Sequence, residues 1–336
     1  MRPGPVLVIQ TAFLGDVVLT TPLLSRLAAR FGPVDVVTTP AAAELIETHP
    51  AVRRVIPYDK RGADRGLGGF RRVAERLADA RYPGVFLPHR SWRSAALAAC
   101  AHIPERIGFE DSPAAILYTK RVPRPRGGHE SDRIMALADG AAQGDAAPAV
   151  RLTLTDADRA TADAWLRERK ITGPFLAVAP GSIWGTKRWP GYAELVARMT
   201  QPVVVLGSAA DRGLADEVAA AGAGRAHSAA GALSLRESAA IIARADLLVT
   251  NDSAPLHLAT GVGTPVVAVF GPTTPSQGFG PIGAGSRVVE QKGLWCRPCS
   301  PHGPATCPLG HHTCMQAIGV ERVLAAVASA SAAGAH

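Results

Sequence analysis

Two series of alternating strand-like and helical segments dominate this sequence, and they restrict its fold more than any other feature. In the first series, apolar runs such as 6–9, 34–37 and 85–87 alternate with segments of helical periodicity. A second series with the same rhythm starts at Phe175. Short buried runs separated by helices are typical of a parallel sheet that is covered on both faces. The predicted fold class is therefore α/β, with two Rossmann-like, doubly wound domains.

A change in composition marks the expected boundary between the two series. Residues 138–147 are rich in Ala, Gly and Asp and lack periodicity, which is typical of a linker. We expect an N-terminal domain over 1–150, a C-terminal domain over 151–320 and a closing helix over 321–336. Ligands of such sheets bind at the carboxyl ends of the strands, so the cleft between the domains is the expected site.

Composition narrows the functional class. Of the 336 residues 47% are hydrophobic, yet no run reaches the roughly 18 apolar residues of a membrane span. The first residues lack the features of a secretory signal, so a cytoplasmic protein is expected. The net charge is +8, which reflects either a preference for Arg or a positive surface that faces phosphates. Aromatic residues are only 5% and do not alternate with basic runs, which argues against nucleic-acid binding.

Three polar segments follow predicted strands and carry the candidate chemistry. In segment 11–16, Asp16 begins a helix that is expected to run to about Arg30, and its carboxylate could cap backbone N–H groups or act as a general base. Segment 180–190 gathers hydroxyls, glycine amides and the cations Lys187 and Arg188 where the phosphates of a nucleotide would lie. The alternative is that Lys187 and Arg188 are two solvated charges before a helix. Segment 250–257 opens a helix, where Asp252 or Ser253 could be the N-cap, or Asp252 could hold sugar hydroxyls.

Other nucleotide motifs are missing. No strand is followed by Gly-x-Gly-x-x-Gly, which makes a standard dinucleotide site a poor interpretation. Segment 181–187 has the wrong glycine spacing and the wrong order of Thr and Lys for a P-loop.

These segments, taken in order, resemble glycosyltransferase family 9, the ADP-heptose:lipopolysaccharide heptosyltransferases, and most closely its heptosyltransferase II branch. The resemblance covers nearly the whole chain. The matching pieces are Leu14-Gly15-Asp16-Val17-Val18 with Thr21-Pro22, Leu87-Pro88-His89-Arg90-Ser91, Ile103-Pro104-Glu105-Arg106-Ile107-Gly108-Phe109, Pro180-Gly181-Ser182 with Lys187-Arg188-Trp189-Pro190, Thr250-Asn251-Asp252-Ser253 with His257-Leu258-Ala259, and Phe270-Gly271-Pro272-Thr273. Each piece alone is weak, but the ordered set is specific.

The resemblance implies a GT-B fold, in which the first domain holds the acceptor, the second holds the nucleotide-sugar, and the last helix crosses back to the first domain. It also implies inverting transfer of L-glycero-D-manno-heptose from ADP-heptose to the lipopolysaccharide inner core (Kdo/heptose-lipid A). Asp16 is then the general base, and Lys187 stabilises the departing diphosphate. The implied donor-binding residues are Ser182, Thr186, Arg188, Leu233, Asp252, Ser253, Ala254 and His257. The implied acceptor-binding residues are Thr11, Leu14, Gly15, His89, Arg90 and Arg93.

The chain departs from the family pattern at several positions. Ala254 stands where Gly is usual, and His89 stands where Asn is common. Ser208 and Ala209 occupy the place of a ribose-binding carboxylate, and Leu233 falls where adenine would rest. Adenine specificity is therefore the weaker part of the implied donor.

Four of the five cysteines cluster near the C-terminus. Cys296, Cys299, Cys307 and Cys314 are separated by two, seven and six residues. In an intracellular protein this pattern indicates a structural zinc site, and free thiols or a local disulfide are the alternative. Cys100 stands alone in an apolar stretch and is predicted to be a small core residue.

No cofactor is expected for catalysis, because a Lys and a helix N-terminus can neutralise a diphosphate and no Asp-x-Asp motif lies near the donor segments. Two other functions stay open. One is transfer of another nucleotide-sugar, or to another acceptor, by the same fold. The other is a degenerate, non-enzymatic binding module. A peripheral site on the cytoplasmic face of the inner membrane follows from the acceptor, and the Arg-rich segment 121–126 could meet anionic headgroups or be a solvated loop.

Overall fold

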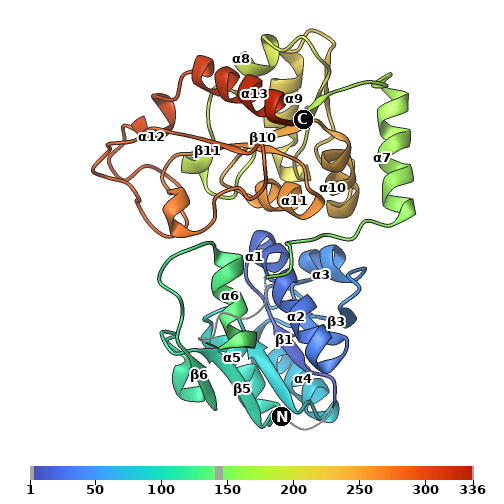
Figure 1. Ribbon diagram of the computed structural model, residues 1–336, viewed down its shortest axis with the longest axis vertical. Coiled ribbons are helices and arrows are strands. Elements are labelled where there is room, and N and C mark those ends of the chain that lie inside the picture. The colour runs from blue at the N-terminus through green and yellow to red at the C-terminus, as the bar shows by residue number, and fades with distance from the viewer. Residues whose placement is uncertain (1–3, 141–146, 335–336) are drawn as a thin grey trace. The chain divides into compact units, whose positions relative to one another are not determined.

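The computed structural model describes residues 4–140 and 147–334. The chain divides into two compact units, Met1–Thr153 and Leu154–His336. Each unit contains one six-stranded parallel sheet with helices on its faces (Figure 1). The predicted α/β fold with two doubly wound sheets is therefore confirmed. Residues 141–146 of the expected linker lie outside the described residues.

The first sheet has the strand order β3-β2-β1-β4-β5-β6. Its strands are β1 (Leu7–Ile9), β2 (Val34–Thr38), β3 (Val52–Pro57), β4 (Gly84–Leu87), β5 (Glu105–Phe109) and β6 (Lys120–Val122). Its helices are α1 (Leu14–Leu19), α2 (Thr21–Phe31), α3 (Pro40–Ile46), α4 (Gly66–Asp79), α5 (Trp92–Cys100) and α6 (Glu130–Asp139). The chain adds strands on one side of β1 and then returns to add β4 on the other side, which creates a topological switch point between β1 and β4.

Alternation of side chains along the strands distributes the core between the two faces of this sheet. Leu7 and Ile9 of β1 pack with Val73 and Leu77 of α4 and with residues of α5. Val8 lies between them in sequence and points to the opposite face, where it is also fully buried. Both faces of the central strands are therefore apolar, as a parallel sheet between two helical layers requires.

The second sheet repeats the topology with the order β12-β11-β10-β7-β8-β9, so its switch point lies between β7 and β10. Its strands are β7 (Leu176–Ala179), β8 (Val203–Val205), β9 (Ala226–Ser228), β10 (Leu247–Asn251), β11 (Val266–Phe270) and β12 (Arg287–Glu290). Its helices are α7 (Asp156–Glu168), α8 (Tyr192–Ala197), α9 (Arg212–Ala220), α10 (Leu235–Arg244), α11 (Ala254–Val262), α12 (Thr313–Gln316) and α13 (Val320–Gly334).

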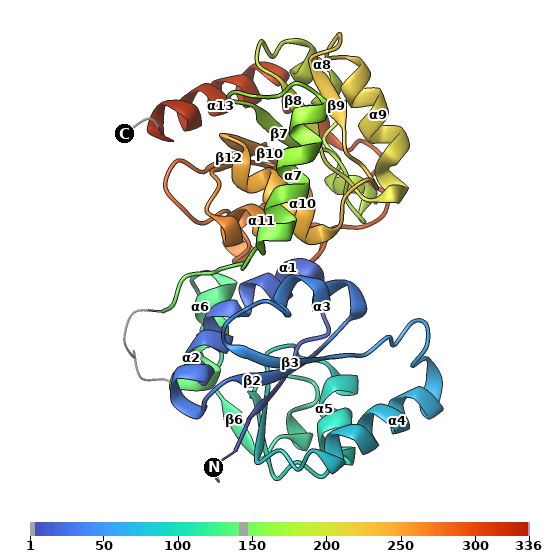
Figure 2. The same cartoon turned by 90° about the vertical axis from the view of Figure 1, so that its right-hand side faces the viewer.

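One face of the second sheet is covered by α8, α9 and α13, whose apolar residues share a core with the strands. Helix α7 packs against α10, which in turn packs against α11 (Figure 2). Val323 and Val327 of α13 are buried in the core of this unit. Helix α13 is thus part of the second unit, and its expected crossing to the first domain stays a prediction.

The structure corrects two local expectations. The single helix expected from Asp16 to Arg30 is two helices, α1 and α2, which meet at Thr20. Pro22 explains the break, because it lacks the N–H that a continuous helix would need there. Cys100 is exposed rather than part of the core, because it ends α5 on the outer side of that helix. Among the described residues, no helix combines the length and the apolar character that crossing a membrane would require.

A buried charge stabilises the first sheet far from the carboxyl ends of its strands. Asp35, near the start of β2, is fully buried and accepts hydrogen bonds from Arg53 at 2.8 and 2.7 Å. Arg54 and the Tyr82 hydroxyl donate to the same carboxylate at 3.1 and 2.5 Å. Burial alone would raise the pKa of Asp35, but these donors and the two positive charges hold it below its usual value.

We expect Asp35→Asn to lower the free energy of unfolding at pH 7 by about 1.5–3 kcal/mol, because hydrogen bonds to a charged group are lost. The pKa of Asp35 is lower in the folded than in the unfolded protein. Its contribution is therefore complete above the unfolded pKa and is lost as the pH falls through the folded value. Urea denaturation at pH 7 and pH 3 should show the difference from wild type shrinking in acid.

Glu75→Gln is the control, because Glu75 pairs with Arg71 at 2.7 Å on the exposed side of α4 and such a pair contributes about 0–1 kcal/mol. An Asp35→Asn variant as stable as Glu75→Gln at pH 7 would contradict the assignment.

Candidate functional site

The predicted site segments follow the strands that flank the two switch points. Segment 11–16 follows β1, and segment 89–93 follows β4. In the second unit, segment 180–188 follows β7, and segment 252–254 follows β10. These are the positions at which doubly wound sheets bind their ligands.

An ion pair joins the two segments of the second unit. The Lys187 ammonium donates to Asp252 Oδ2 at 2.6 Å, and the two side chains are only 10% and 9% exposed. The Thr273 hydroxyl donates to the same carboxylate oxygen, also at 2.6 Å. The structure therefore brings together the two residues that the sequence analysis singled out, and it adds Thr273, which follows β11.

Asn251 anchors the segment after β7 to the end of β10. Asn251 is fully buried, and its amide oxygen accepts from the backbone N–H of Trp189 at 3.1 Å and from the Tyr192 hydroxyl at 3.2 Å. Its amide nitrogen donates to the carbonyl of Pro180 at 2.8 Å. Sequence reasoning quoted Asn251 and Thr273 only as parts of motifs. The signal that could have identified both was a polar side chain at the end of an apolar strand, for Asn251, or in the loop just after one, for Thr273.

The other predicted donor residues occupy different local settings. The guanidinium of Arg188 donates twice to the carbonyl of Ser182, at 3.0 and 2.8 Å, and so closes the loop between them. Thr186 is buried in a 3₁₀ turn over Gly185–Lys187. Ser253 and Ala254 begin α11, and Leu233 is half-buried just before α10. His257 is buried in α11 with its ring edge-on to Phe279 at a centroid distance of 6.2 Å.

Asp211 lies beside the loop after β7. Its carboxylate accepts from the backbone N–H of Ser208 at 3.0 Å and from the Ser208 hydroxyl at 2.6 Å. A Cβ on Gly181 would come within 2.6 Å of Asp211 Oδ1, so glycine is required for this close approach. Asp211 therefore fixes the path of the backbone at the strand ends.

In the first unit, Asp16 is the third residue of α1 and is half-buried. Its Oδ2 accepts from the backbone N–H of Phe13 at 3.1 Å, in a capping arrangement. The capping role considered from the sequence is thus observed, and this contact orients the carboxylate at the end of β1. Leu14 and Gly15 form the first two positions of the same helix.

A group of cations lies near this loop, and sequence reasoning missed part of it. Lys60 donates to the carbonyl of Thr11 at 2.7 Å, and Thr11 Oγ1 lies 3.3 Å from the hydroxyl of Ser94. Burial and the positive charges of Arg61 and Arg93 lower the pKa of Lys60. A cation at residue 60 had no motif of its own, since only the fold brings it to segment 11–16.

The remaining predicted acceptor residues follow β4. Arg93 donates to the Tyr58 hydroxyl at 3.0 Å. Arg90 pairs with Asp111 at 2.8 Å, and both side chains are 44% exposed. His89 is half-buried at the start of the same segment.

The cysteine segment folds onto the second sheet without forming an evident metal centre. Cys299 Sγ donates to the carbonyl of Cys296 at 3.2 Å. Burial and the neighbouring thiols raise the pKa of Cys314 to about 11, whereas backbone N–H groups, that of His312 foremost, lower the pKa of Cys307. Within residues 4–140 and 147–334, no three His, Cys, Asp or Glu side chains are arranged to hold a metal ion. The thiols are therefore neighbours rather than ready-made ligands.

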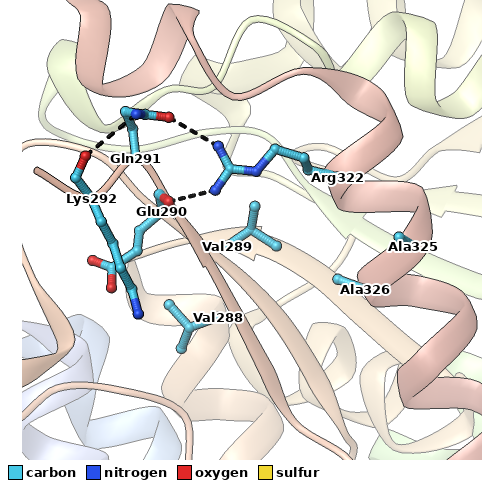
Figure 3. Close-up of a pocket in the computed structure, with 8 residues that line it drawn as sticks. All are labelled: Val288, Val289, Glu290, Gln291, Lys292, Arg322, Ala325 and Ala326. Carbon is cyan, nitrogen blue, oxygen red and sulfur yellow. Dashed lines mark hydrogen bonds between the residues drawn. The ribbon is translucent and has the colours of Figure 1, made fainter.

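A separate pocket of about 580 Å³ lies between β12 and α13 (Figure 3). Arg322 crosses it and donates to the carbonyl of Glu290 at 2.7 Å and to the side-chain oxygen of Gln291 at 3.0 Å. The residues that line it are Val288, Val289, Glu290, Gln291, Lys292, Arg322, Ala325 and Ala326. It contains none of the predicted site residues, and it lies at the sheet edge rather than at the switch point.

Comparison with known proteins gives a consistent result. The model of the family described as glycosyltransferase family 9 (heptosyltransferase) matches residues 70–308. The chain is 32% identical to lipopolysaccharide heptosyltransferase 1 of Pseudomonas aeruginosa, over 88% of this chain and 85% of that protein. It is 28% identical to lipopolysaccharide heptosyltransferase 2 of Salmonella typhimurium, over 80% and 83%. The structure of E. coli ADP-heptose lps heptosyltransferase II superposes with a TM-score of 0.80 at 23% identity, over 98% and 99%.

Proposed function

Because the chain belongs to glycosyltransferase family 9 and is a glycosyltransferase, we propose that it transfers L-glycero-D-manno-heptose from ADP-heptose to the inner core of lipopolysaccharide. The Lys187–Asp252 pair at the switch point of the second sheet is the observation that carries this proposal. The similar proteins support the substrates, since they are lipopolysaccharide heptosyltransferases and one of them is named for ADP-heptose.

Lys187 is suited to a diphosphate leaving group. A lysine ammonium has three N–H donors, and Asp252 accepts from one of them. The carboxylate holds the ammonium in place while another N–H donates to a phosphate oxygen. In a site this buried, a fixed positive charge stabilises the negative charge that develops on the departing ADP.

Asp16 is the proposed general base. Its carboxylate takes the proton from the acceptor hydroxyl, and that oxygen attacks the anomeric carbon of the heptose. The bond between this carbon and the diphosphate breaks, and its electron pair leaves with ADP. Direct displacement of this kind inverts the anomeric configuration, and no metal takes part in the proposed step. The contact with the Phe13 N–H keeps the carboxylate in one orientation.

The first prediction concerns the nucleotide. We expect wild-type protein to bind ADP in preference to UDP and GDP in isothermal titration calorimetry. Lys187→Ala should weaken ADP binding about 10- to 100-fold, because a charge-assisted hydrogen bond contributes about 1.5–3 kcal/mol. Lys292→Ala removes the same charge from the exposed rim of the β12–α13 pocket and should leave ADP binding unchanged.

Each of the two other possible calorimetric results would indicate a different function. A preference for UDP or GDP would indicate the alternative transferase, which uses another nucleotide-sugar. Absence of binding to all three nucleotides would favour the non-enzymatic module.

The second prediction concerns the base. Asp16→Asn keeps the size of the side chain but cannot accept the proton. It should reduce kcat about 10²- to 10⁴-fold, the usual contribution of a general base, with little change in ADP affinity. Steady-state assays with ADP-heptose and a heptose-deficient lipopolysaccharide measure this effect. Unchanged turnover would remove Asp16 from the role of base.

A structural zinc in the cysteine segment is a further proposal, supported by the spacing of the four cysteines and by the mutual influence of their thiols. The arrangement described above is not a preformed ligand set, so zinc would have to draw the thiols together. Elemental analysis should find about one zinc per chain in wild type and in Cys100→Ser, but not in Cys307→Ser. Equal zinc content in wild type, Cys100→Ser and Cys307→Ser would contradict the proposed zinc site.

We also propose a peripheral location on the cytoplasmic face of the inner membrane, because the proposed acceptor is a lipid there. Two arginines of segment 121–126 are engaged within the protein, since Arg121 donates to the carbonyl of Ala115 and Arg124 pairs with Glu130. Glu130 offsets the charge of Arg124, whereas Arg121 keeps its full charge because a carbonyl is neutral, so the attraction is weaker than the count of arginines suggests by one charge. Vesicle binding that is insensitive to salt would contradict the electrostatic part.

A further inference from the structure

A loop from the cysteine segment lies directly on the turn that carries Lys187. The Thr186 hydroxyl donates to the carbonyl of Pro304. The Nε2–H of His312 donates to the carbonyl of Thr186 at 2.8 Å. The side chain and the carbonyl of Thr186 are thus both hydrogen-bonded to residues more than 110 positions later in the chain. Loop 302–312 therefore determines where this short turn lies.

Gly303 of this loop lies beside the side chain of Lys187. Its φ is +78°, and a Cβ there would lie 3.4 Å from both Lys187 Cε and Thr186 Oγ1, and 3.0 Å from Pro272 Cγ. The approach is mutual, because a Cβ on Gly185 would come within 2.6 Å of the carbonyl oxygen of Ala305. A Cβ at residue 303 would therefore be tight against Pro272 and would touch the stem of Lys187, and a longer side chain would have to displace one of them.

His312 adopts a backbone conformation that residues with a side chain rarely choose. Its φ is 46° and its ψ is 28°, in the left-handed region. Such conformations persist where surrounding contacts enforce them, and they concentrate at functional sites. The hydrogen bond to Thr186 is such a contact. Its acceptor, the carbonyl of Thr186, belongs to the residue just before Lys187, so the left-handed residue is bonded directly to the turn that carries the lysine.

The electrostatics of the loop agree with this placement. Burial and the charge of Lys187 lower the pKa of His302, and the charge of Asp252 acts in the opposite direction. His302 therefore lies within the field of the ion pair.

We propose that loop 302–312 is a positioning element for Lys187, with Gly303 and His312 as positioning residues. The inference rests on the proposed function, because it assigns the loop a part in donor binding. Gly303 leaves space for the lysine stem, and His312 holds the turn from the other side. The ammonium is thereby kept at Asp252, where it meets the diphosphate.

A pair of glycine variants separates this role from simple backbone strain. Gly303→Ala and Gly310→Ala place the same side chain at φ values of +78° and +74°, but a Cβ at Gly310 meets nothing within 4 Å. Both should lower the melting temperature through the strained backbone, and Gly303→Ala should lower it somewhat more because its Cβ is tight against Pro272. Only Gly303→Ala should also weaken ADP binding, by about tenfold or more, and raise the KM for the donor. Equal ADP affinity in the two variants would overturn the proposal.

A second pair tests the histidine. His312→Gly suits the left-handed backbone and removes only the hydrogen bond, so it should fold as well as wild type yet bind ADP more weakly. His312→Asn tolerates the same backbone and retains an N–H donor, so it should recover part of the affinity. Wild-type affinity in His312→Gly would contradict the role of His312.

A measurement without nucleotide distinguishes this proposal from the proposed function. Brief acetylation followed by mass spectrometry reports how accessible Lys187 is. Gly303→Ala and His312→Gly should be labelled at Lys187 several times faster than wild type and Gly310→Ala. If wild type binds no ADP but this labelling pattern holds, the donor is wrong and the positioning role stands. Uniform labelling would refute the positioning role whatever the nucleotide.

Discussion

The hydrogen-bonded pair of Lys187 and Asp252 is the constraint around which the second unit is organised. A lysine this buried needs a partner, and Asp252 at the end of β10 supplies one while Thr273 holds the carboxylate from β11. The short turn that presents the lysine is flanked by contacts from distant residues, since Asn251 accepts from the backbone N–H of Trp189 and His312 donates to the carbonyl of Thr186. Segments that follow β7, β10 and β11, together with loop 302–312, thus surround one ammonium group.

The central strands of both sheets and the edge strand β3 could be predicted from the sequence, whereas the other three edge strands could not. Strands such as β1 and β11 are continuous apolar runs because helices cover both their faces. The strands β6, β9 and β12 were missed because each lies at an edge, is short and carries polar residues such as Lys120 or His227. The break between α1 and α2 was also missed, since its cause is one proline within an otherwise helical pattern.

The candidate site shows the same division between local and distant information. Asp16, Lys187 and Asp252 follow strands and belong to short motifs, so their place at the switch points could be predicted. Thr273, Lys60 and His312 reach the same regions only through tertiary folding. Their contacts span between 21 and 126 residues, and no local pattern encodes such a separation. Assigning the role of each residue from the sequence depended on family resemblance, not on spacing.

Each unit keeps all its strand pairings and a complete apolar core within itself. Among the residues that the structure describes, neither sheet includes a strand from the other unit, so a change of sequence in one unit leaves the hydrogen-bond ladder of the other untouched. Evolution can therefore exchange or diversify one half as a module. In a transferase built this way, recombination within one half could change what that half recognises, while the other half is inherited unchanged.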